Sequence, residues 1–311
     1  MEFTHSRAEA EEPVPWRRIA LFFGLAMLLT HSGMALYLLR GGATDTMGAS
    51  GFGAVFMRWC PGLLALIFQR LVNRDSLRSL LSLDVRPNRW FVAAWLWPVL
   101  WFLLILGLTL AVPGTRYTPD LSGLREHFAG TTEAELAQAR AQVSSLPLPA
   151  VVVLPLAALL IGPTLSTLAA MGEEIAWRGY LLRALRPLGF LRAMLLAALM
   201  QYIWHLPFLY EGFMYPGHAL YGSSAMLAWI GLMSFVTTYV TVRARSVWAA
   251  AIFHGVSGAS GPITAALYAG GNYYLVGETG VLGLAALLPF AIACWVHDRF
   301  ISKSPMLGGQ G

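Results

Sequence analysis

Eight predominantly apolar runs, each about 20 residues long, divide this sequence of 311 residues. An α-helix needs a run of this length to cross a bilayer, whereas a strand of a membrane β-barrel is shorter. Charged residues make up 12% of the chain, against about 25% in soluble proteins, which excludes an ordinary soluble enzyme. We therefore expect an all-α, polytopic membrane protein with about eight transmembrane helices. The runs cover residues 19–39, 52–72, 90–112, 149–171, 190–210, 223–242, 247–268 and 280–297.

The arginines are concentrated in alternate loops. Of the 21 Arg and Lys residues, 16 lie in the leader, the tail and the connections after the second, fourth and sixth runs, and three lie in the stretch 113–148. Because positively charged loops remain in the cytoplasm, both termini are expected there. The preference for arginine over lysine favours a bacterial inner membrane. The basic residues form no stripe, so no nucleic-acid partner is indicated, and the oligomeric state stays open.

The stretch 113–148 contains one segment that reads as a surface helix, Glu133 to Val143. Thr132 and Glu135 have the spacing of a capping box at its start. The two cysteines, Cys60 and Cys294, lie in apolar runs without the spacing of a metal site.

Ionisable residues inside membrane helices are costly, and each is therefore a candidate functional residue. The last five of the seven found here fall within 82 residues, on the fourth, fifth and seventh runs and their connections. The seven are His31, Arg58, Glu173, Glu174, Arg178, His205 and His254.

Spacing along the helices brings these groups together. Glu174 and Arg178 are four residues apart with the acid first, the favourable order for an ion pair, and Glu173 then points to another face. A turn at Pro187-Leu188-Gly189 leaves Glu173 16 residues before Gly189 and His205 16 residues after it. In an antiparallel hairpin the two side chains reach the same depth. His254, roughly 13 Å into its own helix, reaches that depth if the hairpin extends past the bilayer.

Three stretches around these residues resemble one known family. GEEIAWRGYLLRALRPLG, WHLP and SVWAAAIFH, which ends at His254, are similar to the CPBP family of intramembrane proteases. That family includes the type II CAAX prenyl endopeptidases and abortive-infection and bacteriocin-immunity proteins. The resemblance implies three parts: a leader, three helices and an outer loop (1–148), a protease core (149–268), and a last helix with a cytoplasmic tail (269–311).

The resemblance also implies hydrolysis of a peptide bond in a membrane-associated peptide or protein, near the cytoplasmic face. Glu173 would be the general base on a water molecule, with His205 and His254 orienting that water or stabilising the oxyanion. Glu174 and Arg178 would support the site. No cofactor is certain. A divalent metal such as zinc, held by Glu173, His205 and His254, is the alternative, although a glutamate bound to metal cannot also be the base.

Two positions depart from the family pattern. Gln201 stands where an aromatic residue is usual, and Gly258 stands where asparagine or a similar residue is usual. We expect the Gln201 amide to supply the polar contact that Gly258 cannot. The departures also keep a second hypothesis open, a catalytically silent immunity or partner-binding protein on the same scaffold.

Two further classes of membrane protein fit the sequence less well. A transporter would be favoured by inverted repeats, which the sequence lacks. A rhomboid-like serine protease is suggested by GASG at 48–51 and 258–261, but Gly255, Gly258 and Gly261 are more simply a face for close helix packing.

Finally, five arginines are expected to line a cytoplasmic entrance to the site and to attract an acidic or C-terminal segment of the substrate. They are Arg178, Arg183, Arg186, Arg243 and Arg245.

Overall fold

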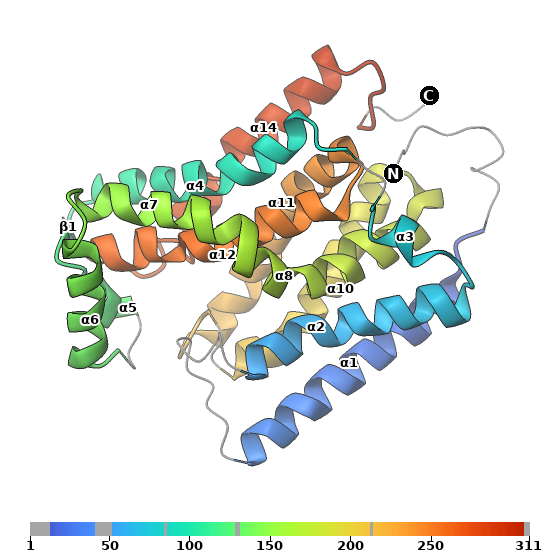
Figure 1. Ribbon diagram of the computed structural model, residues 1–311, viewed down its shortest axis with the longest axis horizontal. Helices are drawn as coiled ribbons and strands as arrows, with labels where there is room; N and C mark the ends of the chain where they lie inside the picture. Colours follow the sequence, from blue (N-terminus) through green and yellow to red (C-terminus); the bar gives the residue numbers. More distant parts are fainter. Residues whose placement is uncertain (1–12, 41–51, 84–85, 128–130, 212–213, 308–311) are drawn as a thin grey trace.

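The computed structural model describes residues 13–40, 52–83, 86–127, 131–211 and 214–307, and helices dominate it (Figure 1). The α-helices are α1 (Trp16–Leu39), α2 (Phe52–Ile67), α3 (Leu77–Leu80), α4 (Arg89–Leu110), α5 (Gly123–His127), α6 (Glu133–Ser144), α7 (Ala150–Ile161), α8 (Thr167–Glu174), α9 (Leu182–Ala184), α10 (Phe190–Tyr210), α11 (Ala219–Ala244), α12 (Val247–Leu267), α13 (Val281–Ala285) and α14 (Leu288–Val296). They are extended or joined by the π-helical stretches η2 (Phe68–Val72), η3 (Gly162–Ser166), η4 (Ile175–Leu181) and η6 (His297–Ile301) and by the 3₁₀ turn η5 (Arg186–Leu188).

The expectation of an all-α polytopic membrane protein is confirmed. Seven helical segments in the described part of the chain are long and apolar enough to span a bilayer. They are Trp16–Leu39, Val55–Val72, Arg89–Leu110, Ala150–Ala184, Phe190–Tyr210, Ala219–Ala244 and Val281–Ile301. The eighth expected span is the helix α12, which is absent from this set because polar and small residues interrupt its apolar run.

The helix α12 lies in the middle of the bundle. It packs against α4, α7, α8 and α11, and most of its residues are buried (Figure 1). Because protein rather than lipid surrounds it, α12 can carry a histidine, serines and glycines that a lipid-facing helix would not tolerate well.

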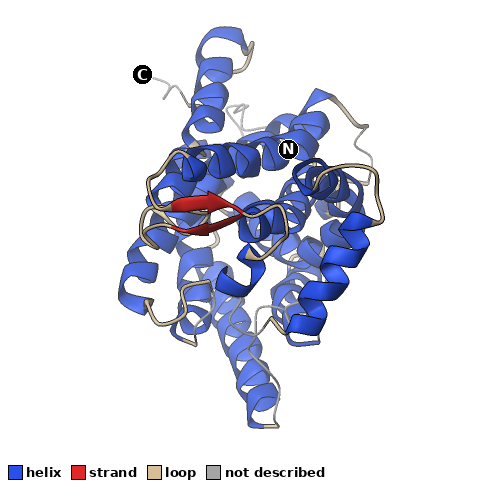
Figure 2. Cartoon of the chain, turned by 90° about the vertical axis from the view of Figure 1, so that its left-hand side faces the viewer, coloured by secondary structure: helices blue, strands red, loops and turns tan. Residues whose placement is uncertain are grey.

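A small antiparallel sheet closes one end of the bundle (Figure 2). The strands β1 (Thr115–Tyr117) and β2 (Tyr268–Gly270) pair with Arg116 opposite Ala269. The sequence had indicated no strand here, since each is only three residues long. The expected surface helix is present as α6, and Thr132 and Glu135 form its capping box.

The fourth apolar run continues beyond residue 171. The helical segment from Ala150 to Ala184 has 35 residues and contains two π-helical stretches, η3 and η4. Its length is about 52 Å at 1.5 Å per residue, well above the ~30 Å hydrocarbon core, so one end must project beyond the bilayer. Pro163 lies in η3, where its missing N–H interrupts the regular helical hydrogen bonds. Glu173 and Glu174 thus lie within this segment and not at its end.

Glycines bring three helices into backbone contact beside these glutamates. A Cβ added at Gly172 of α8 would overlap the carbonyl oxygen of Arg58 and lie 2.6 Å from Cα of Trp59, both in α2. Likewise, a Cβ at Gly255 of α12 would lie 2.6 Å from Cα of Thr167 at the start of α8. Only residues without a side chain allow these approaches. The contacts therefore fix α2 and α12 against α8.

We predict that Gly172→Ala lowers the free energy of unfolding by about 1–3 kcal/mol, because the new methyl group must push α2 away from α8. Gly107→Ala is the matched control, since nothing lies within 4 Å of a Cβ placed there in α4. Denaturation of both purified variants in the same detergent measures the difference. Equal stability of the two variants would contradict the close contact.

Candidate functional site

All six expected site residues line one cavity, of about 170 Å³, in the interior of the bundle. We call it the site cavity. Its walls come from α2, α8, η4, α10, α11 and α12 and from the loops before α11 and α13. The lining residues are Met57, Arg58, Glu173, Glu174, Arg178, Gln201, His205, Met214, Trp229, Ile230, Met233, Ser234, Thr237, Phe253, His254, Ser257, Gly258, Gly261 and Glu278.

Glu174 is the centre of a buried ionic network. Its Oε1 accepts a hydrogen bond from Nη1 of Arg178 at 3.2 Å, which is the ion pair expected from the sequence. The same oxygen lies 2.8 Å from Nδ1 of His254. Arg178 also donates from Nη2 to Oγ of Ser234 in α11, at 3.0 Å. Glu174 therefore contacts His254 as well as Arg178. The contact with His254 was not expected from the sequence.

Glu173 is also buried, with 2% of its surface exposed, but its neighbours are different. Its Oε1 lies 3.8 Å from Nε of Arg58, and its Oε2 lies 3.5 Å from Nε2 of Gln201. The carboxylate of Glu173 thus faces α2 and α10, and that of Glu174 faces η4 and α12. This division follows from the ~100° that separates adjacent residues on a helix.

The two histidines have defined ring orientations. Nδ1 of His205 lies 2.9 Å from the carbonyl oxygen of Gln201, one turn earlier in α10. Since a carbonyl oxygen only accepts, this nitrogen carries the proton, and Nε2 is the unprotonated nitrogen of the neutral ring. In His254, Nδ1 likewise faces a carboxylate oxygen, that of Glu174. Both rings are therefore oriented by a partner on the Nδ1 side.

The expected turn between the two helices of the hairpin is present. Residues 186–188 form η5, and Gly189 follows with φ +79°, a conformation that favours glycine. After this turn α10 packs against η4 and α9, and both Glu173 and His205 line the site cavity.

Arg58 and Glu278 were not expected at the site. The sequence marked Arg58 as an ionisable residue in an apolar run, but nothing local connects α2 with α8. Glu278 lies in the loop between β2 and α13, where a glutamate gives no signal in the sequence. Burial raises the pKa of Glu278 to about 7, so the cavity contains a further carboxyl group that is largely protonated below that pH.

Among the described residues, the five arginines do not line one entrance to the site cavity. Of the five arginines, only Arg178 lines the site cavity, and it is buried. Arg183 and Arg186 line a different cavity. The side chain of Arg243 is 13% exposed and pairs with Asp298, whereas Arg245 is exposed. Arginines at helix ends that look equivalent in sequence thus have different partners.

The glycine face of α12 serves two purposes. Gly255 makes the expected close contact with a neighbouring helix, whereas nothing lies within 4 Å of a Cβ at Gly258 or Gly261. Both of these glycines line the site cavity instead. Ser260, the serine of the second GASG sequence, donates to the carbonyl oxygen of Val256 at 2.7 Å and is buried. The first GASG sequence lies outside the described residues.

A metal ion in the site cavity would need a group of nitrogen, oxygen or sulfur ligands close together. Among the residues that the structure describes, no three His, Cys, Asp or Glu side chains form a group that could hold a metal ion. The cation Arg58 lies beside Glu173, the carboxylate that the zinc alternative requires. As placed, the three side chains of the zinc alternative do not form such a group, and no step of the chemistry below passes through a metal.

One comparison with known proteins finds a match to part of the chain. Residues 155–260, about a third of the chain, match the family model described as type II CAAX prenyl endopeptidase Rce1-like. No curated protein and no solved structure gives a significant match to the chain. The matched region contains all six expected site residues. Through residues 155–260, this all-α membrane protein is similar to the Rce1-like type II CAAX prenyl endopeptidases.

Proposed function

We propose that the protein is an intramembrane endopeptidase in which Glu173 activates a water molecule. The observation that carries this proposal is the placement of a buried glutamate and two oriented histidines, from three separate helices, around one cavity. A carboxylate and two imidazoles together can accept, hold and return a proton, which peptide hydrolysis requires.

In the proposed reaction, Glu173 takes a proton from water, and the water oxygen attacks the carbonyl carbon of the scissile peptide bond. The C–N bond then breaks, and the proton passes from Glu173 to the leaving nitrogen, so that a carboxyl group and an amine are formed. His205 and His254 orient the water and stabilise the charge on the carbonyl oxygen. Arg58 keeps the carboxylate of Glu173 in place, and Glu174 and Arg178 hold the ring of His254.

The substrate we propose is a peptide or protein embedded in the membrane, cleaved in the cytoplasmic half of a bacterial inner membrane. The distribution of arginines supports cytoplasmic termini. His254 follows Val247, the first residue of α12, by seven residues, or about 10 Å from that end of the helix.

Gln201 is placed to replace the polar group that Gly258 lacks. Its amide is near Glu173, and the space beside Gly258 is open. This arrangement favours the protease over a silent partner-binding protein, for which a polar group at this position would have no use.

We expect Glu173→Gln to lower the rate of cleavage by about 10²–10⁴-fold, because the amide keeps the shape of the side chain but cannot accept the proton. The assay uses purified protein in vesicles with membrane-embedded peptides, prenylated CAAX tails among them. Glu133→Gln, on the exposed surface of α6, is the matched control and should cleave normally. Undiminished cleavage by a folded Glu173→Gln variant would refute the role of Glu173.

Gln201→Phe should slow cleavage about tenfold or more, the effect of losing one hydrogen bond to a charged group. Adding Gly258→Asn to this variant should restore part of the rate, because the asparagine side chain would enter the open space beside Gly258. The same peptides and vesicles provide the measurement. If Gln201→Phe cleaves as fast as the parent, Gln201 does not replace the missing polar group.

A further inference from the structure

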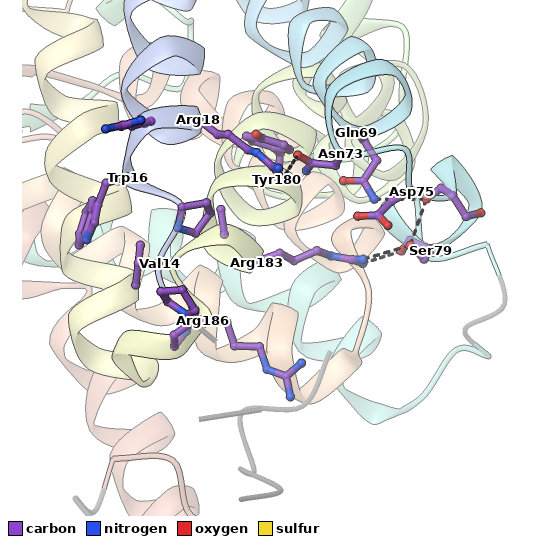
Figure 3. Close-up of a pocket in the computed structure, with 16 residues that line it drawn as sticks. Val14, Trp16, Arg18, Gln69, Asn73, Asp75, Ser79, Tyr180, Arg183 and Arg186 are labelled. Carbon is purple, nitrogen blue, oxygen red and sulfur yellow. Dashed lines mark hydrogen bonds between the residues drawn. The ribbon is translucent and has the colours of Figure 1, made fainter. Parts of the chain in front are cut away.

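A second cavity, of about 1440 Å³, lies at the arginine-rich end of the bundle (Figure 3). Three parts of the chain form it: the start of α1, the segment from η2 to α3, and the end of the long helical segment with η5. None of its described lining residues lines the site cavity. We call it the arginine cavity, after Arg17, Arg18, Arg183 and Arg186.

The charge of the arginine cavity is unbalanced. Four guanidinium groups line it, and Asp75 is the one carboxylate among its described lining residues. Within the described parts of the chain, Arg17, Arg18 and Arg183 form no ion pair with a carboxylate. Like charges held close together repel each other, and this arrangement favours binding of an anion.

The two best-placed guanidinium groups are held by neutral partners. Nη1 of Arg18 donates to Oδ1 of Asn73 at 3.3 Å, and both terminal nitrogens of Arg183 donate to Ser79 (Figure 3). Nε of Arg183 is buried and has no hydrogen-bond partner in the described structure. The neutral contacts orient these two arginines without pairing either of them with a carboxylate.

The position of the cavity favours one kind of anion. It lies at the first residues of α1 and near the end of η4, and Trp16, 54% exposed, lines it with Val14 and Pro15. Tryptophan is typical of the bilayer interface, and basic pockets between transmembrane helices on the cytoplasmic side bind anionic headgroups. A phosphodiester offers two charged oxygens to paired guanidinium donors and carries acyl chains that can lie along α1.

We propose that the arginine cavity binds the phosphate of an anionic phospholipid headgroup, and that Arg18 and Arg183 are its main ligands. The bound lipid joins α1, α3 and α9, three elements at this end of the bundle. The site is independent of the peptidase activity, since it shares no residue with the site cavity.

The test uses the full-length protein in phosphatidylcholine nanodiscs to which phosphatidylglycerol is added. Native mass spectrometry measures the affinity for the added lipid. The double variant Arg18→Gln/Arg183→Gln should bind phosphatidylglycerol at least about tenfold more weakly than the parent. The matched control is Arg70→Gln/Arg299→Gln, which removes the same charge from exposed positions at the same end of the bundle and should bind as the parent does.

Equal affinity of the cavity variant and the control for phosphatidylglycerol would overturn the proposal. So would a rise in thermal midpoint with inorganic phosphate alone that equals the rise with phosphatidylglycerol. Displacement of the bound lipid by an acidic peptide would also overturn it. If Arg18→Gln/Arg183→Gln fails to fold, Arg17→Gln replaces it, because Arg17 is exposed and its change leaves the packing intact. The parent protein gives an independent readout, since its thermal midpoint should rise with phosphatidylglycerol and not with added phosphatidylcholine.

Discussion

The backbone contacts that glycines allow between α2, α8 and α12 determine the rest of the site. Gly172 brings α8 against α2, and Gly255 brings α12 against the start of α8. Each contact lies one residue from a charged or titratable side chain, because Glu173 follows Gly172 and His254 precedes Gly255. A larger residue at either glycine would separate the helices, and with them the side chains that the site requires.

The glutamates can be buried because each has polar partners supplied by another helix. A charged side chain in a bilayer costs about 2.5–3.5 kcal/mol or more without compensation. Arg58 and Gln201 are the partners of Glu173, and Arg178 and His254 are those of Glu174. The two adjacent acids thus have different partners. Glu174 contacts Arg178 and His254 at 3.2 and 2.8 Å, whereas the ion pair of Glu173 with Arg58 is longer, at 3.8 Å, and therefore weaker. The weaker pairing leaves Glu173 better suited to exchange a proton.

Local patterns in the sequence predicted the parts of this arrangement that depend on one helix or one hairpin. Length and hydropathy located the spans, and the four-residue spacing located the ion pair of Glu174 and Arg178. Counting from Gly189 placed Glu173 and His205 at one depth. The partner of His254 depends on how α12 is rotated against α8, and the position of Arg58 depends on a contact between helices far apart in sequence. Neither is encoded in a local pattern. The short strands β1 and β2 gave no signal for the same reason, since each exists only through pairing with the other.

The central claim is that a peptide bond is cleaved in the site cavity beside Glu173. The most direct measurement is a structure of the Glu173→Gln variant with a membrane peptide retained in it. Our account predicts that the scissile carbonyl lies within hydrogen-bonding distance of residue 173 or of a water molecule bound to it, with His205 and His254 beside it. A peptide bound only in the arginine cavity or on the lipid-facing surface would contradict that account.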